Sequence, residues 1–269
     1  MLLEGLWRNW GFYFTACTQP DGVGSSDLEQ VLRDLKHFRR LKPISIENRD
    51  TVLVENRELA ARRSLLLLFV RMFIFRAFLE CASETPGGIT ENHKGRWLLV
   101  QVAPHILLRT EDIFFAFTRL MGRASYQYLE EAIALEHVRV KCLGPKPGPL
   151  FCVLDEAQVP ANEFSNCFQS EAEQFRPILH EIIPQWTKIL PNLIVSGTGV
   201  SMQEVGNVLG SVVAKEGDLL PTMTSIGGFD NMDDQRAYLQ HYLPPGFLDT
   251  TQGEEIARRA GYWLRGRFV

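Results

Sequence analysis

Residues 150–158 read Leu-Phe-Cys-Val-Leu-Asp-Glu-Ala-Gln, an apolar run that ends abruptly in two carboxylates. A short apolar run of this kind is typical of a strand buried on both faces of a parallel sheet. In open α/β sheets, ligands bind beyond the carboxyl ends of the strands. The stretch therefore predicts a parallel α/β fold with Asp155 and Glu156 at its ligand-binding edge.

Two acids at such an edge indicate metal-assisted chemistry. In nucleotide hydrolases built this way, the first acid holds the magnesium shell, and the second orients or deprotonates the attacking water. We therefore expect Asp155 to be a ligand of Mg²⁺ and Glu156 to be the catalytic base. The alternative is structural, because acidic residues also favour the first turn of a helix.

A second strand with a polar end lies further along the chain. Residues 193–199 read Leu-Ile-Val-Ser-Gly-Thr-Gly and follow Pro191. Ser196 or Thr198 is expected to contact a γ-phosphate or the attacking water. A strand-to-helix turn that uses its glycines for geometry is the alternative. Residues 223–226 form a third candidate strand.

Composition narrows the class of protein. The 269 residues are 45% hydrophobic and 22% charged, with a net charge of −4, which gives no sign of nucleic-acid binding. The five cysteines form no CxxC pair, which favours a reducing compartment, cytoplasmic or nuclear. The apolar run 65–79 contains Arg71 and Arg76, so we expect a buried helix and no membrane span. The N-terminal residues lack the pattern of a signal peptide.

Most of the remaining chain has helical spacing of its apolar residues. Ser26 or Asp27 can cap a helix, and Thr90 can cap another, although residues 97–102 would also suit a strand. A polar loop is expected after Gln158. The expected strand near the start covers residues 11–17, and the expected helices cover residues 2–9, 27–40, 51–82, 91–102, 112–121, 126–143, 171–189, 233–242 and 254–264.

The sequence has no phosphate-binding loop of the form GxxxxGK[ST]. Such a loop brings backbone N–H groups and a lysine to the phosphates. The glycines of Gly22-Val23-Gly24 are followed by no Lys-Ser or Lys-Thr, so a turn is expected there.

Several motifs, taken in order, resemble a known family. The chain is similar to the P-loop ATPase module of a group of uncharacterised fungal proteins, which resembles the NTPase domain of Crinkler-type proteins and, more distantly, STAND-like ATPases. The resemblance covers essentially the whole chain. It is carried by residues 1–16, Gly24-Ser25-Ser26-Asp27-Leu28, residues 95–101 (Gly-Arg-Trp-Leu-Leu-Val-Gln), the Walker-B-like Leu154-Asp155-Glu156-Ala157-Gln158, Ser196-Gly197-Thr198-Gly199 and residues 262–267 (Tyr-Trp-Leu-Arg-Gly-Arg).

The resemblance implies roles for further residues. Residues 2–6 would be the tail of the helix that follows the phosphate-binding Gly-Lys-Thr, so the first strand and its loop would be missing. That strand would lie between the one ending at Val195 and the one near Ile226, which would either pair directly or leave an exposed edge. Arg265 and Arg267 would supply a lid arginine to the nucleotide, although a basic helix end is the simpler explanation. Arg176 is a weaker candidate for an arginine finger.

Together these observations predict a three-layer α/β, P-loop NTPase-like parallel sheet with a large helical insertion and a partial C-terminal lid. We expect the core at 1–230, the insertion at about 28–143 and the lid at 231–269. The expected function is ATP binding and hydrolysis, here in a truncated or inactive form. The alternative is a non-enzymatic interaction protein or pseudo-ATPase remnant, with a protein partner on the helical insertion.

Overall fold

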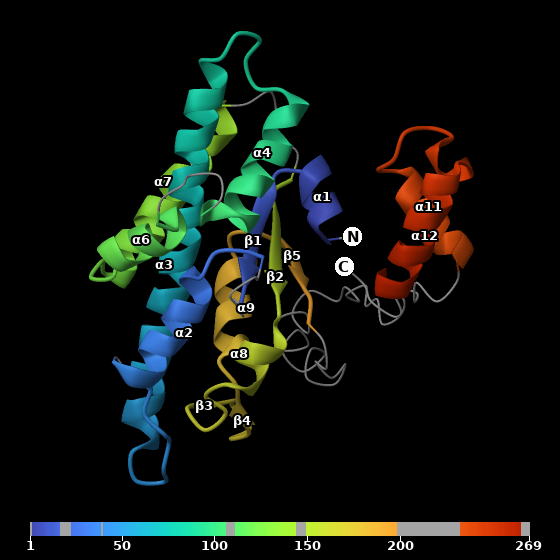
Figure 1. The fold of residues 1–269 in the computed structure, drawn as a ribbon. Coiled ribbons are helices and arrows are strands. Elements are labelled where there is room, and N and C mark those ends of the chain that lie inside the picture. The colour runs from blue at the N-terminus through green and yellow to red at the C-terminus, as the bar shows by residue number, and fades with distance from the viewer. Residues whose placement is uncertain are drawn as a thin grey trace. The chain divides into compact units, whose positions relative to one another are not determined.

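A computed structural model describes residues 2–16, 23–38, 40–105, 111–143, 149–197 and 232–264 (Figure 1). The chain forms two compact units, Leu2–Gly217 and Asp218–Val269. The candidate strand at 223–226 and the candidate residues Thr198, Arg265 and Arg267 lie outside the described residues.

The first unit contains a three-stranded parallel sheet. Its strands are β1 (Gly11–Thr15), β2 (Phe151–Asp155) and β5 (Asn192–Val195), in the order β1-β2-β5. The register pairs Thr15 with Asp155 and Leu154 with Val195, so all three strands end at one edge. The prediction of an α/β fold with a parallel sheet is confirmed, and the acid-bearing strand is the central one.

Helices cover both faces of the sheet. On one face, Tyr13 and Val153 pack against Leu6 of α1 (Leu2–Arg8) and Leu98 of α4 (Glu91–Val102). On the other face lie α3 (Arg49–Ser83) and α9 (Leu179–Thr187), where Trp186 stacks 4.3 Å from Phe14. The alternation of side chains along the strands explains why two separate apolar layers form.

Helix α4 also closes the free edge of β1. Trp97 Nε1 and Gln101 Nε2 donate to the carbonyl oxygen of Gly11, at 2.7 and 3.1 Å. Gln101 Oε1 accepts from the backbone N–H of Tyr13 at 2.9 Å. Residues 97–102 belong to this helix, so the strand alternative for them is wrong. Their side chains form hydrogen bonds with the backbone groups of β1 that a neighbouring strand would otherwise bind.

The second half of the long helix α3 lies in the core. Leu65, Leu66, Leu67, Leu68 and Val70 are almost fully enclosed, as the apolar run predicts. No helix among the described residues is long and apolar enough to cross a membrane.

Arg71 interrupts that apolar run without leaving the core. Its Nη2 binds Asp27 Oδ1 at 2.9 Å, and both side chains are 0% exposed. Its guanidinium group also lies 3.8 Å from the centre of the Phe114 ring. Asp27 begins α2 (Asp27–His37), so this buried pair joins α2 to α3.

Helix α7 (Tyr126–Leu143) packs along α3 and runs in the same direction. Phe69 contacts Tyr128 near one end, and Arg76 binds Glu136 at 2.6 Å further along. Helix α6 (Ile113–Leu120) precedes α7 and begins at Asp112, whose Oδ1 accepts from two backbone N–H groups. The predicted helices of this region are confirmed.

The segment after β2 departs from the prediction. A short helix, α8 (Gln158–Asn162), stands where a loop was expected. The predicted helix at 171–189 is wrong in its first half, because β3 (Phe168–Gln169) and β4 (Phe175–Arg176) form a small antiparallel pair and the helix begins only at Leu179. Pro177 accounts for the difference, since proline pushes the preceding residue away from helical geometry.

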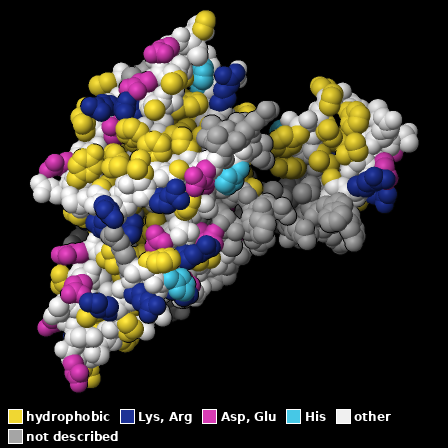
Figure 2. All heavy atoms as spheres, turned by 60° about the vertical axis from the view of Figure 1, so that its left-hand side comes forward, with side chains coloured by type: hydrophobic (Ala, Val, Ile, Leu, Met, Phe, Trp, Pro, Cys, Tyr) yellow, Lys and Arg dark blue, Asp and Glu magenta, His cyan; other side chains and the backbone are white. Residues whose placement is uncertain are grey.

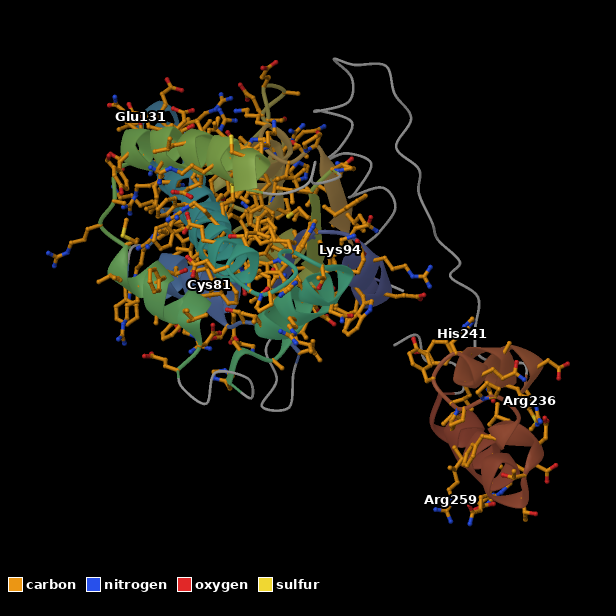
Figure 3. The ribbon with its side chains drawn as sticks, turned by 90° about the horizontal axis from the view of Figure 1, so that it is seen from above. Cys81, Lys94, Glu131, Arg236, His241 and Arg259 are labelled. Atoms are coloured by element: carbon orange, nitrogen blue, oxygen red, sulfur yellow. The ribbon has the colours of Figure 1, made fainter. Side chains whose placement is uncertain are left out.

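The described part of the second unit, residues 232–264, is a helical pair. It contains α11 (Met232–Gln240), the 3₁₀ turn η1 (Phe247–Asp249) and α12 (Thr251–Leu264), close to the two helices predicted there. Arg236, labelled in Figure 3, donates to the carbonyl oxygen of Leu248 and to Asp249 Oδ1, at 3.0 and 2.6 Å. These bonds join α11 to the turn that precedes α12.

Candidate acidic site at the carboxyl end of the sheet

The acidic site lies where the three strands end. The backbone of this edge is tied together across the strands. The N–H of Ser196 donates to Leu154 O at 2.8 Å, and that of Ala157 donates to Ser196 O at 2.9 Å. Ala16 N–H donates to Asp155 O at 3.2 Å. Asp155, Glu156 and Ser196 are therefore brought together on a fixed backbone, as the sequence predicts.

The carboxylate of Asp155 is held by two donors. Its Oδ1 accepts from the N–H of Glu156 at 3.0 Å, and its Oδ2 accepts from the hydroxyl group of Tyr13 at 2.8 Å. Each carboxylate oxygen has a second lone pair, which remains available to a cation. The two bonds fix the orientation in which Asp155 presents that lone pair.

Tyr13 is the member of this site that the sequence prediction missed. Its side chain is buried, and burial is the main reason why its pKa lies far above its usual range. The negative charge of Asp155 raises this pKa further, and Glu156 adds to the effect. The phenol therefore stays protonated and acts as a donor. In the sequence, Tyr13 stands between two phenylalanines of a strand, a pattern that predicts core packing and reveals no partner.

Glu156 has a backbone conformation that is uncommon for its type. Its φ angle is 55°, in the left-handed region. A strained backbone of this kind persists only where the surrounding structure maintains it, and such residues cluster at functional sites. The conformation turns the chain from β2 into α8, and the Glu156 carboxylate accepts a hydrogen bond from Gln158 Nε2.

The two acids have no basic partner among the described residues: no lysine, arginine or histidine there forms an ion pair with Asp155 or Glu156. Neighbouring carboxylates without a counter-charge favour a cation. Magnesium suits this arrangement, because proteins usually bind it through one or two carboxylates, with water and phosphate as the other ligands. In the described part of the chain, no three His, Cys, Asp or Glu residues are grouped as a complete metal cage.

Two other polar residues, Asn162 and Arg176, have interactions elsewhere in the structure. Asn162 is exposed at the end of α8 and donates to Gln158 O at 2.7 Å. Burial raises the pKa of Glu181, and the positive charges of Arg57 and Arg176 oppose this rise. The described contact of Arg176 is thus an electrostatic one with Glu181, and its role as an arginine finger stays a prediction.

Comparison of this chain with protein-family models, curated proteins and solved structures found no match.

Proposed function

We propose that the carboxyl end of β2 binds a magnesium–nucleotide complex, as part of a P-loop NTPase-type module. The observation that carries this proposal is the pair Asp155 and Glu156, which ends the central strand with no basic partner among the described residues and with Asp155 oriented by Tyr13. The strand order supports the proposal, because polar residues of two neighbouring strands meet at this edge.

In this proposal Asp155 holds magnesium, directly or through its water shell. Bound magnesium would neutralise the charge of the phosphates. Glu156, next to Asp155 on the turn, would orient or deprotonate a water molecule, and Ser196 would contact the water or the terminal phosphate. Thr198 and Arg267 are proposed as further nucleotide contacts.

The sequence limits how much of this chemistry to expect. It contains no GxxxxGK[ST] loop, so neither the backbone cradle nor the lysine of that motif is present. We therefore propose binding as the main property and expect hydrolysis to be weak or absent.

Thermal unfolding in the presence of Mg-ATP tests this proposal. A ligand that binds only the folded state stabilises it by about RT ln(1 + [L]/Kd), so millimolar Mg-ATP should raise the Tm. Asp155→Asn should abolish the part of the shift that requires magnesium, measured as the difference between Mg-ATP and ATP in EDTA. Glu156→Gln should retain this part and remove any residual hydrolysis. Glu171→Gln, which changes an exposed acid elsewhere, is the control and should behave as wild type.

The second candidate is a non-enzymatic interaction protein that retains the sheet of an ATPase. The missing phosphate-loop motif favours it. An unchanged Tm at millimolar Mg-ATP, identical in wild type and Asp155→Asn, would support this candidate and reject nucleotide binding at β2.

A further inference from the structure

A hollow of about 340 Å³ lies between α2 and α6. Its lining residues differ from those of the acidic edge. Its walls include Asp34 from α2, Arg63 from α3, Phe115 and Arg119 from α6, and Arg123 from the turn that follows. A volume of this size falls within the range of small-molecule sites, roughly 300–1,000 Å³.

The charge of these walls is unbalanced. Three arginines face the hollow with Asp34 as the only acid among its described lining residues. Arg63 brings its charge into the interior, since only 5% of the residue is exposed. Arg119 and Arg123 outnumber Asp34 even without Arg63, and this excess of positive charge should attract an anion.

The two outer arginines are weakly neutralised. Arg119 reaches one described acid, Glu111, at 4.0 Å, and both side chains are more than half exposed. An exposed pair at that distance contributes little. Arg123 is exposed and forms no ion pair or hydrogen bond within the described ranges.

The turn that carries Arg123 is held in place. Arg62 Nη1 donates to the carbonyl oxygens of Gly122 and Ala124, at 3.3 and 3.0 Å. Beside this turn, Thr118 Oγ1 is buried without a hydrogen-bond partner in the described part of the structure, and the residue is 5% exposed. A fixed turn reduces the conformational entropy that the protein would lose in ordering this segment around a ligand.

We propose that this hollow binds a small phosphate-bearing anion. Guanidinium groups match the geometry of phosphate oxygens and form paired, charge-assisted hydrogen bonds with them. Phe115 adds an aromatic wall, on which the ring of a nucleotide can stack. Figure 2, which brings this side of the helical layer forward, shows basic and hydrophobic side chains next to one another on the surface. None of its described lining residues belongs to the acidic edge, whose charge has the opposite sign.

Calorimetric titration of the full chain with pyrophosphate, and separately with ATP, tests this site. Both titrations contain EDTA, so that no magnesium supports binding at β2. Wild type should bind at least one of the two probes at millimolar concentration or better. The double variant Arg119→Gln/Arg123→Gln should weaken this binding at least tenfold. Equal affinities for the probes would identify the polyphosphate as the recognised group, and tighter ATP binding that Phe115→Leu removes would identify a nucleotide.

Matched variants separate a site from general charge attraction. Arg8→Gln/Arg139→Gln removes the same charge from exposed positions on α1 and α7 and should leave affinity within twofold. Asp34→Asn should strengthen binding several-fold, because it removes the acid that faces the arginines. Glu131→Gln, on the outer surface of α7 in Figure 3, makes the same change of charge and should have no such effect.

Two results would overturn the proposal: no binding of either probe by wild type, or equal loss of binding in the two double variants. Asp155→Asn separates this site from the proposed function. It should leave binding in EDTA unchanged, even if it abolishes the additional response that depends on magnesium.

Discussion

The hydroxyl group of Tyr13 donates a 2.8 Å hydrogen bond to Oδ2 of Asp155, across the pair of strands β1 and β2. This contact connects a core aromatic residue to the acid on which the proposed magnesium site depends. Its strength depends on Tyr13 keeping its proton, which makes the contact sensitive to alkaline pH.

We expect the stability of the protein to fall above pH 10, partly because of Tyr13. Its pKa is raised in the folded state, mainly by burial and then by Asp155, so above about pH 10 only the unfolded state readily loses this proton. The contribution of Tyr13 is complete below that pH and is lost as the pH rises, at a rate approaching 1.4 kcal/mol per pH unit. Urea unfolding from pH 9 to 11.5 should therefore show a shallower decline for Tyr13→Phe than for wild type.

Asp155→Asn is the control for this pH dependence. It removes the charge that raises the Tyr13 pKa but leaves the phenol buried, and burial is the larger cause. Most of the alkaline decline should therefore persist in Asp155→Asn. Identical slopes for wild type and Tyr13→Phe would contradict the assignment.

The left-handed conformation of Glu156 predicts an unusual response to glycine. With φ at 55°, a side chain at this position costs about 1–2 kcal/mol. Glycine avoids this strain, but it gives the unfolded chain more conformational freedom, which lowers the stability by about 0.4–1 kcal/mol. Glu156→Gly should therefore be more stable than Glu156→Ala, by about 0.5–1 kcal/mol in urea unfolding.

Lys188 provides the matched position, because it is exposed and has φ at −59° in the right-handed region. There the order should reverse, with Lys188→Gly less stable than Lys188→Ala. If glycine is the less stable choice at both positions, Glu156 is not strained.

The buried pair Arg71 and Asp27 should show strong energetic coupling. Arg71→Met leaves the Asp27 carboxylate in the core without its cation, which typically costs about 3–5 kcal/mol. Asp27→Asn keeps the shape and the acceptor for the Leu28 N–H, so the double variant should lose much less than the sum of the two single losses. Urea unfolding of the four proteins measures this coupling. Additivity within about 0.5 kcal/mol would show that the two groups do not depend on one another.

The sequence predicted the elements with strong local signals. The apolar run that ends at Asp155 identified the central strand, and three- and four-residue spacing identified the helices α6 and α7. Asp155, Glu156 and Ser196 could be placed at one edge, because parallel strands end together. These predictions needed only periodicity and chain direction.

The remaining features depend on contacts between distant residues. Tyr13 meets Asp155 across 142 positions, and Gln101 meets Tyr13 across 88. The strain at Glu156 is set by the chain's turn from β2 into α8, and glutamate itself gives no signal of it. The arginines of the hollow between α2 and α6 come from two parts of the chain, Arg63 in α3, and Arg119 and Arg123 at the end of α6 and in the turn after it. A single sequence contains no local pattern for such juxtapositions.

The side chain of Gln101 should control the edge of β1. It is 0% exposed and is the acceptor for the Tyr13 N–H. Gln101→Met keeps the volume but leaves that buried N–H without its acceptor, at a cost of about 1–3 kcal/mol. Hydrogen exchange of the Tyr13 amide should accelerate more than that of Val153, which lies in the interior of the central strand. Gln127→Met is the matched change, because the Gln127 side chain donates to Glu131 on the exposed surface of α7. It should alter stability by less than about 0.5 kcal/mol. Unchanged protection of Tyr13 in Gln101→Met would show that α4 does not close this edge. Faster exchange confined to β1 would show that a helix side chain supplies the hydrogen bond that a neighbouring strand would otherwise provide. It would also link the packing of α4 to β1, the strand whose Tyr13 orients Asp155.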